Sequence, residues 1–425
     1  MNPTKILLEA PILTQSGYGE HSRLVYNSIK DLPGVEIYIC PLVWGATSWV
    51  TDVDFLIENS IKNFHEYENF CKQTNTNPDY DIQIRVGIAN EFEKRAKKSV
   101  LVTAGIETDR VSWSWIVKTH QGIDKIIVPS EHSKVSFDGT VYEAENRTNN
   151  TKTKVKCNCP VEVVPYPVKQ LNHANLDIDF KTDFNFLNVG LFGVRKNIEQ
   201  CIEWFIKEFK DDENVGLVLK TGVARGTQLD REITLKKINK MLEKHDDRKC
   251  KVYLVHGNMT DEEVHSLYIH PKIKALVTTT HGEGYGLPIF EAAYSGLPVV
   301  ATDWSGHLDF LQGTVKKAGK EKKKKLFARV DYSLKEIQKE AIWEDILIEG
   351  SRWAYPEEVS FRRQISNVRK NYSLYKSWAK TLKEQLEESH KESAVFEKMR
   401  TAIGIQTSQE ITDEIEAMFA SLPQE

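Results

Sequence analysis

Two glutamates flank a glycine-rich segment in the second half of the chain, which reads His-Gly-Glu-Gly-Tyr-Gly-Leu-Pro-Ile-Phe-Glu from His281 to Glu291. The segment follows a short apolar run, and Pro288 suits the first residue of a helix because its missing N–H would be unpaired there anyway. Gly284 and Gly286 allow the backbone to approach a ligand, and the free N–H groups of a helix start favour a phosphate. The pattern predicts a diphosphate site.

The two acids suit the other parts of such a ligand. We expect Glu291 in the first helical turn, where the helix dipole supports a carboxylate that could accept two hydrogen bonds from a ribose diol. Glu283 is expected on the loop, facing the same cleft. The alternative is that Glu291 only complements the helix dipole and that the glycines only form a turn.

The conjunction of both features resembles the Glu-x7-Glu signature of retaining glycosyltransferases of the GT-B fold, most closely family 4. That resemblance implies two Rossmann-like domains facing across a cleft, a UDP- or GDP-linked sugar donor held mainly by the C-terminal one, and no required metal or other cofactor. It also implies that Glu283 contacts hydroxyls of the donor sugar and Glu291 the ribose. The backbone of Gly284, Tyr285, Gly286 and Leu287 would then meet the phosphates.

A second loop, Gly190 to Asn197, also follows an expected strand and opens an expected helix. Lys196 matches the family lysine and can offer a point charge to a departing diphosphate. The family usually has an arginine where this chain has Leu191. Arg195 or Lys220 could supply that second cation, although Arg195 could equally be an exposed residue of the first helical turn.

A glycine turn, Thr14 to Glu20, follows the first expected strand, at the carboxyl end where open α/β sheets bind ligands. Gly17 and Gly19 are expected to admit the donor phosphates or sugar. His21 and Arg23 could reach towards the acceptor from the helix that follows.

Three more segments lie where the family places functional residues. Glu107, at the end of the expected strand 99–107, is the predicted contact of the reacting sugar, and helix capping is its alternative. Trp113 and Trp115 could form a stacking platform for an acceptor sugar or base, but tryptophan on a helix often packs in a core. The resemblance implies that the backbone near Asn258 reads the nucleobase edge.

Short β-branched runs alternate with longer amphipathic segments, which predicts an α/β fold with parallel sheets. The first series of expected strands is 5–11, 35–42, 82–88, 99–107 and 124–129. The second series is 184–192, 215–222, 251–257, 273–280, 297–304 and 325–332, with helices such as 197–209 and 261–270 between strands. Two doubly wound domains follow from this count.

The predicted boundaries are an N-terminal acceptor domain over 1–168, a donor domain over 169–355 and C-terminal helices over 356–425. Two prolines near the first boundary indicate a hinge, and a polar stretch, about 138–160, indicates an inserted hairpin or loop. We expect the first part of the C-terminal helices to pack back on the N-terminal domain and the last ~25 residues to form a separate helix.

Composition limits the alternatives. The 425 residues are 40% hydrophobic, which fits globular domains. They carry 57 Lys and Arg against 61 Asp and Glu, and the resulting net charge of −4 disfavours a protein that coats nucleic acid with a basic surface. No apolar run reaches the ~18 residues of a membrane span, and the charged start is unlike a signal peptide, so a cytoplasmic protein is predicted. Six sparse cysteines predict reduced thiols, and Cys157 and Cys159 lack further zinc ligands nearby.

The predicted activity is retaining transfer of a sugar to a hydroxyl of a glycan, lipid or protein. One alternative is a DNA-modifying glycosyltransferase that acts on a hydroxylated base, with Lys316 to Lys325 as the DNA contact, although such a lysine run usually marks a solvated mobile loop. A second is a non-catalytic subunit that binds the nucleotide sugar. Asp52-Val53-Asp54 has the Asp-x-Asp form of metal-dependent GT-A enzymes, but nothing else in the sequence supports that fold.

Overall fold

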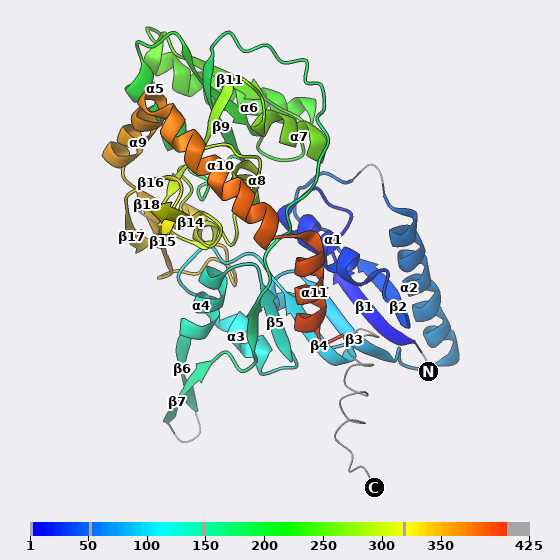
Figure 1. The fold of residues 1–425 in the computed structure, drawn as a ribbon. Coiled ribbons are helices and arrows are strands. Elements are labelled where there is room, and N and C mark those ends of the chain that lie inside the picture. The colour runs from blue at the N-terminus through cyan, green and yellow to red at the C-terminus, as the bar shows by residue number, and fades with distance from the viewer. Residues whose placement is uncertain (1–2, 51–52, 147–149, 318–319, 406–425) are drawn as a thin grey trace.

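The structure is a computed structural model that describes residues 3–50, 53–146, 150–317 and 320–405. The structure has two halves, and each is built on a six-stranded parallel sheet (Figure 1). We call the part of the chain from β1 to β8 the N-terminal half and the part from β9 to β16 the C-terminal half. Helices cover both faces of each sheet, as the alternating sequence pattern predicts. Each half therefore has the Rossmann-like architecture expected from the sequence.

The N-terminal sheet has the order β2-β1-β3-β4-β5-β8. Its strands are β1 (Thr4–Ala10), β2 (Val35–Pro41), β3 (Tyr80–Val86), β4 (Ala96–Val102), β5 (Lys125–Val128) and β8 (Val161–Val163). Its helices are α1 (Gly17–Ile29), α2 (Phe55–Thr74), the short η1 (Ala89–Glu91), α3 (Trp113–Thr119) and α4 (Glu131–Gly139). Most residues of the central strands β1 and β3 are buried, since both faces of a doubly wound sheet are covered by helices.

The C-terminal sheet has the order β11-β10-β9-β12-β13-β16. Its strands are β9 (Phe184–Val189), β10 (Val215–Lys220), β11 (Lys251–Val255), β12 (Ile273–Val277), β13 (Val299–Thr302) and β16 (Ala328–Val330). Its helices are α5 (Ile198–Phe209), α6 (Gln228–Leu242), η2 (Glu243–His245), α7 (Asp261–Tyr268), α8 (Leu287–Tyr294) and η3 (Gly306–Leu308). The strand order reverses between β9 and β12, and ligands of such sheets bind beyond the strand ends at this reversal.

Three antiparallel pairs lie outside the large sheets. The polar stretch after α4 is a hairpin of β6 (Val141–Asn146) and β7 (Thr151–Lys156), as predicted. The lysine run is also a hairpin, β14 (Gln312–Lys317) with β15 (Lys320–Lys325), so the expectation of a loop there is wrong. The third pair, β17 (Tyr332–Glu336) and β18 (Arg352–Pro356), encloses the short η4 (Lys339–Ala341).

The C-terminal helices α9 (Glu358–Lys370), α10 (Tyr372–Ser389) and α11 (Glu392–Ile403) run across both halves (Figure 1). The structure contradicts the expected order of packing. Because α9 contacts α5 and β16, and α10 contacts α8 and β14, the first part covers the C-terminal half, and only α11 returns to α1. Most of the predicted terminal helix lies outside the described residues.

None of the helices in the described residues combines the length and the apolar character needed to cross a bilayer.

The sequence candidates for a metal site have other roles or lie outside the described residues. Asp54 caps α2 by accepting a hydrogen bond from the Leu56 amide at 2.9 Å, and Asp52 lies outside the described residues. In the same described ranges, no three His, Cys, Asp or Glu side chains form a group that could hold a metal ion. The Sγ atoms of Cys157 and Cys159 lie 4.0 Å apart, and both thiols are free.

Candidate functional site

Three predicted charged residues meet at the strand-order reversal of the C-terminal sheet. Lys196 and Arg195 lie on the loop between β9 and α5, and Glu283 lies on the loop between β12 and α8. Lys196 Nζ donates to Glu283 Oε1 at 2.6 Å, and Arg195 Nη1 donates to Glu283 Oε2 at 2.9 Å. The two loops are thus joined through one buried carboxylate, whose residue is 6% exposed.

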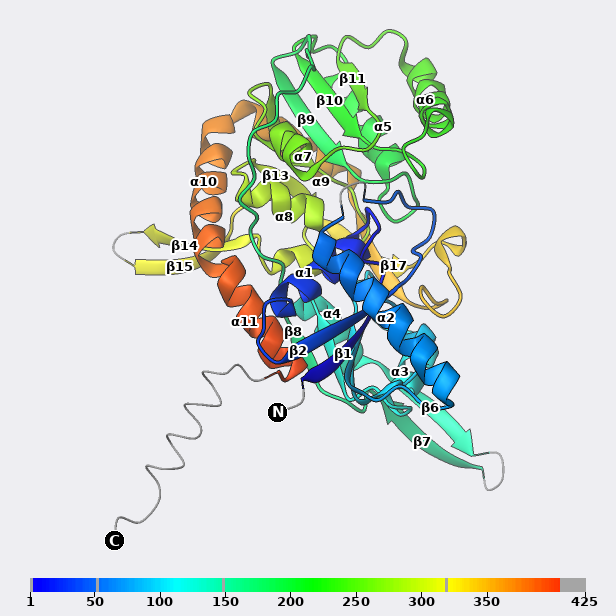
Figure 2. The same ribbon diagram turned by 90° about the vertical axis from the view of Figure 1, so that its right-hand side faces the viewer.

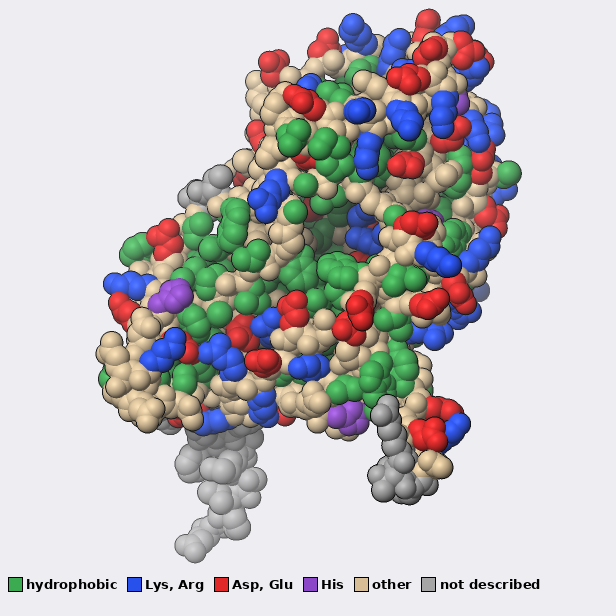
Figure 3. Space-filling view, turned by 180° about the vertical axis from the view of Figure 1, so that it is seen from behind, with side chains coloured by type: hydrophobic (Ala, Val, Ile, Leu, Met, Phe, Trp, Pro, Cys, Tyr) green, Lys and Arg blue, Asp and Glu red, His purple; other side chains and the backbone are tan. Residues whose placement is uncertain are grey.

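Glu107 brings the N-terminal half into this cluster. It follows β4, and its Oε1 lies 3.4 Å from Arg195 Nε. Arg195 Nη1 also donates to the Gly282 carbonyl at 2.8 Å. The guanidinium group therefore contacts both halves at once, and Figure 3 shows the hollow where the two halves meet.

The electrostatics of the cluster follow from burial and pairing. Burial alone would raise the pKa of Glu283, but Lys196 and Arg195 outweigh it and lower that pKa to about 2. Burial raises the pKa of Glu107, against the opposing effect of Arg195. Burial also lowers the pKa of Lys196, although Glu283 acts against this shift. Glu283 is thus the firmly ionised acid of the pair, and Glu107 is the acid that accepts a proton more readily.

The glycine-rich loop serves a contact that the sequence did not indicate. A Cβ atom on Gly284 would collide with the Ala104 carbonyl, and one on Gly282 would collide with the Glu107 carbonyl. Ser130 Oγ of the N-terminal half donates to the Gly284 carbonyl at 2.5 Å. The missing side chains of these two glycines admit the other half of the protein, which is a reason for glycine at these positions that the sequence did not indicate.

We predict that Gly284→Ala will strain this interface and destabilise the protein by about 1–3 kcal/mol, the usual range for overpacking. Thermal unfolding measures the effect. The control is Gly139→Ala at the end of α4, where a Cβ would meet nothing within 4 Å. Equal melting temperatures for the two variants would contradict the prediction.

Helix α8 starts where the loop ends, one residue earlier than expected. Gly286 has φ of +95° and stands at the N-cap, Leu287 is the first helical residue and Pro288 the second. Only glycine adopts this backbone conformation without strain. Tyr285 beside it is 4% exposed, and its ring packs 5.0 Å from that of Tyr166.

Glu291 is consequently the fifth residue of α8, beyond its first turn, so the predicted position in the first turn is wrong. Its Oε2 accepts a hydrogen bond from the Tyr268 hydroxyl at 2.8 Å. Burial raises the pKa of Glu291 to about 7, although the Tyr268 bond opposes the shift. The carboxyl is therefore held in place by α7 and titrates near neutrality.

Lys220 and Asn258 lie at the ends of the neighbouring strands. Lys220 Nζ donates to the Gly257 carbonyl at 2.7 Å, and burial lowers the pKa of this amine. Asn258 Oδ1 accepts from the Ser48 hydroxyl of the N-terminal half at 3.1 Å, and the same hydroxyl lies 2.7 Å from the Arg225 carbonyl. This further contact between the halves was not predicted, because Ser48 belongs to no recognisable motif.

The predictions around α1 are wrong in three places. The helix begins at Gly17, and a Cβ on Gly19 would collide with the Thr14 carbonyl, so Gly19 admits its own loop rather than a donor. His21 is 0% exposed, and burial lowers its pKa to about 3. Arg23 donates to the Ile12 and Thr14 carbonyls at 2.9 and 3.0 Å. Neither side chain reaches towards an acceptor, whereas a Cβ on Gly17 would meet open space.

The two tryptophans have different environments. Trp115 is 1% exposed, with its ring 6.0 Å from that of Phe137, so it belongs to the core and cannot be a platform. Trp113 at the start of α3 is 41% exposed and meets Tyr142 edge-on at 5.4 Å. Only Trp113 keeps an accessible ring.

Sequence reasoning missed Lys169, which lies between the two halves. Its Nζ forms an ion pair with Asp261 of α7 at 2.8 Å and another with Glu20 of α1. Tyr268 was missed as well. An isolated lysine in a polar linker and a tyrosine at a helix end carry no pattern that predicts either contact.

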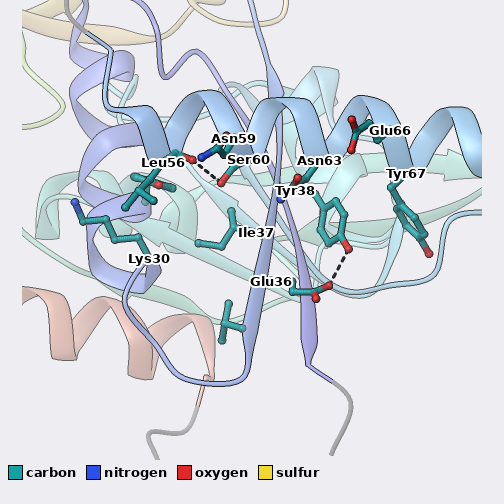
Figure 4. A pocket seen from close by; sticks show the side chains of 12 residues that line it. Lys30, Glu36, Ile37, Tyr38, Leu56, Asn59, Ser60, Asn63, Glu66 and Tyr67 are labelled. Carbon is teal, nitrogen blue, oxygen red and sulfur yellow. Dashed lines mark hydrogen bonds between the residues drawn. The ribbon is translucent and has the colours of Figure 1, made fainter.

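Two cavities lie apart from the charged cluster. One of about 560 Å³ lies between α1, β2 and α2, and the side chains that line it include Tyr38, Asn59 and Asn63 (Figure 4). Another of about 310 Å³ is lined by Tyr285, Asp309 and His390, among others. Of the predicted site residues, only Tyr285 lines either cavity.

Comparison with known proteins agrees with the fold. Sucrose-phosphate synthase from Thermosynechococcus elongatus is 13% identical over 99% of this chain and all of that one, with a TM-score of 0.57. HepE from Anabaena, in complex with UDP and glucose, is 11% identical over 97% of this chain and all of that one, with a TM-score of 0.54. An Escherichia coli trehalose-6-phosphate structure with bound UDP-2-fluoro glucose is 8% identical over 95% of this chain and all of that one, with a TM-score of 0.57.

A mutant of Staphylococcus aureus TarM is more similar to this chain in sequence than these three proteins are, but less similar in structure. It is 19% identical and the match covers 76% of this chain, with a TM-score of 0.48, and this chain spans about 55% of its length. No curated protein matches the sequence.

The chain therefore has the GT-B fold of glycosyltransferases. Residues 176–340, which carry the cluster except for Glu107, match the model of the family Glycosyl transferases group 1.

Proposed function

We propose that this protein is a retaining, metal-independent glycosyltransferase of the family 4 type. It moves a sugar from a nucleoside diphosphate, UDP or GDP, to a hydroxyl group of a glycan, lipid or protein. The observation that carries the proposal is the meeting of Lys196, Arg195 and Glu283 at the strand-order reversal, with Glu107 beside them. The family match over 176–340 supports it, as do the similar folds that hold UDP with glucose or UDP-2-fluoro glucose.

The two cations account for departure of the diphosphate in this proposal. Negative charge grows on the leaving phosphate oxygen as the bond to the sugar breaks, and preoriented cations stabilise that charge at low reorganisation cost. Glu283 holds Lys196 and Arg195 at one point before the donor arrives. The amides of residues 284–287 at the start of α8 add partial positive charge. That no metal ion takes part rests on the family resemblance.

The acids orient the sugar. A carboxylate has about four lone-pair sites, so Glu283 can accept sugar hydroxyls while it keeps both ion pairs. Glu107 contacts the reacting sugar from the N-terminal half. The acceptor hydroxyl attacks from the face that the diphosphate leaves, and the leaving phosphate oxygen takes its proton. This last step rests on the family resemblance.

The nucleoside lies nearer α7 and β11 in this proposal. Glu291 accepts hydrogen bonds from the ribose, and the backbone near Asn258, with Lys220 beside it, meets the base. Gly17 borders the donor from the other half, and Trp113 provides an aromatic surface for the acceptor. We assign residues 1–168 to acceptor binding, 169–355 to the donor and 356–425 to the helices that connect them. The cytoplasmic location stays a prediction.

Donor binding should depend on the charge of Glu291. With a pKa of about 7 this carboxyl is mostly protonated at pH 6 and mostly ionised at pH 8, and the ionised form accepts more strongly from the ribose hydroxyls because it is charged and both oxygens are free of a proton. We predict that UDP binds up to about tenfold more tightly at pH 8 than at pH 6. Isothermal titration of wild type and Glu291→Gln measures this, and the variant should lose the dependence.

The raised pKa of Glu291 should make the folded protein less stable as pH rises, whereas the same rise in pH should make UDP binding tighter. Because the folded pKa lies above the ordinary value of 4.5, the wild type should lose stability relative to Glu291→Gln as pH rises from about 4.5 to about 7. Glu397→Gln on the exposed face of α11 is the control and should track the wild type at every pH.

For the binding experiment, a UDP affinity of the wild type that is constant between pH 6 and pH 8 would contradict the role of Glu291.

A screen of nucleotide sugars tests the function. A ligand at 100 times its dissociation constant adds about 2.7 kcal/mol of stability, an easily measured thermal shift. The stabilising donor is then incubated with the protein to follow nucleotide release, and NMR of the product reports the anomeric configuration. Release with retention supports the proposal. A donor that binds but never turns over with any acceptor would support a non-catalytic binding subunit instead.

A further inference from the structure

The hairpin of β14 and β15 carries a concentration of positive charge that the proposed function does not use. It stands outside both parallel sheets beside α10, with pairing from Gln312↔Lys325 to Lys317↔Lys320 (Figure 2). Strand β15 reads Lys-Glu-Lys-Lys-Lys-Lys, and its residues 320–324 are exposed. We call this two-stranded hairpin the basic ribbon.

Contacts from α10 hold the ribbon in a fixed position. Gln385 Oε1 accepts from the Thr314 amide at 2.8 Å, and Gln385 Nε2 donates to the Thr314 carbonyl at 2.7 Å. Lys324 Nζ lies 3.8 Å from the ring centroid of Trp378, an arrangement favoured by the electron density of the ring face. The ribbon is therefore an anchored element, unlike the mobile loop that a lysine run usually forms.

Only one lysine of β15 has an acidic partner among the described residues. Lys325 pairs with Asp303 at 2.5 Å. Lys320, Lys322 and Lys323 make no ion pair within the part of the chain that the structure describes. Their charges are left for an external anion.

The positive surface continues onto α10. Lys376 Nζ donates to the Gly296 carbonyl at 2.8 Å, and its pKa is lowered by burial and, to a smaller extent, by the charges of Lys383 and Lys274. Lys383 lies on α10 between Trp378 and Gln385, the two residues that hold the ribbon. Lys383 pairs with Glu387 at 3.6 Å, so in a protein with a net charge of −4 the lysines at this place that have no hydrogen-bond or ion-pair partner among the described residues are those of β15.

We propose that the basic ribbon docks on double-stranded DNA. The major groove of B-DNA is about 12 Å wide and admits a two-stranded β-ribbon, and lysines on such a ribbon can meet phosphates on the groove walls. The major groove of double-stranded RNA is too deep and narrow for side chains to read. Surfaces that bind anionic membranes combine Lys or Arg with exposed Trp, Phe or Leu, and the exposed residues of β15 include none of these.

This docking site goes beyond the proposed sugar transfer and does not depend on it. None of the ribbon lysines contacts the cluster of Glu283, Lys196 and Arg195 among the interactions of the described residues. DNA binding and donor turnover can therefore fail separately.

Fluorescence anisotropy with the full chain and a duplex of about 20 base pairs tests the proposal. Each phosphate neutralised contributes about 0.9 to the slope of log K against log salt concentration. The triple variant K320Q/K322Q/K323Q is expected to lower that slope by about 2.7 and to weaken binding by about tenfold or more in 50 mM salt. The matched control K236Q/K240Q/K244Q removes the same charge from exposed lysines of α6 and η2, and should keep the wild-type slope.

Three results would overturn the proposal. The first would be that the duplex does not bind the wild type in 50 mM salt, and the second that the two triple variants lose affinity equally. The third would be that the protein prefers vesicles of anionic phospholipid to the duplex at equal anion concentration. Thermal unfolding checks that both variants are folded. Both should retain wild-type donor turnover, so that a loss of DNA binding is not confused with failure of the transferase function.

Discussion

Glu283→Gln is expected to lower donor turnover by about 10²–10³-fold, the scale seen when one preorganised polar group is removed from a catalytic site. Glutamine keeps the size of the side chain but removes the charge that holds Lys196 and Arg195 at 2.6 and 2.9 Å. It also weakens acceptance from the sugar hydroxyls. Hydrolysis of the donor in the absence of acceptor, followed by nucleotide release, measures the effect without knowledge of the acceptor.

The stability of the same variant provides an independent measurement. The pKa of Glu283 is about 2, below its ordinary value of 4.5, so its charge stabilises the folded protein above about pH 4.5 and this contribution is lost as pH falls towards 2. Glu283→Gln should therefore be less stable than wild type at pH 7, and the difference should shrink on acidification. Glu397→Gln serves again as the exposed control. Wild-type turnover in a folded Glu283→Gln would remove this residue from the mechanism.

The central part of the site could be predicted because the information is local. Lys196 and Glu283 each follow an apolar strand, and each lies on a loop that opens a helix. In a doubly wound sheet the ends of adjacent parallel strands come together, so two such loops meet wherever their strands are neighbours. Here β9 and β12 are neighbours, and the side chains meet at 2.6 Å.

The errors concern contacts between distant segments. Trp115 and Trp113 differ by two positions on one helix and so face different ways, and the ring of Trp115 packs near Phe137 in the core while that of Trp113 meets Tyr142 nearer the surface. Gly284 has the sequence context of a ligand loop, but the carbonyl that fills its open side comes from Ala104 in the other half. No local pattern identifies that neighbour.

The lysine run shows how context overrides composition. Lysine has a low preference for strands, and consecutive like charges repel one another. The strand forms because Trp378 and Gln385 of α10, far along the chain, bind Lys324 and the Thr314 backbone. The error in Glu291 has a smaller cause, since it follows from expecting Pro288 rather than Leu287 as the first residue of α8.

The second cation of the site can be assigned by comparing two variants. The family resemblance implies an arginine at the position of Leu191, a side chain that has no charge and is 49% exposed. Arg195 is our assignment for the missing cation because it contacts both Glu283 and Glu107, whereas Lys220 binds the Gly257 carbonyl at 2.7 Å.

We therefore expect Arg195→Gln to lower kcat by about 10²-fold and Lys220→Gln by no more than about threefold, with both effects measured by nucleotide release under saturating donor. Arg195→Lys should recover only part of the lost rate, because lysine restores the charge but cannot span two carboxylates as the guanidinium group does. Thermal unfolding of each variant separates loss of charge from loss of fold. A larger loss in Lys220→Gln than in Arg195→Gln would move the second cation to the end of β10, and the leaving diphosphate would then lie further from Glu107 than we propose.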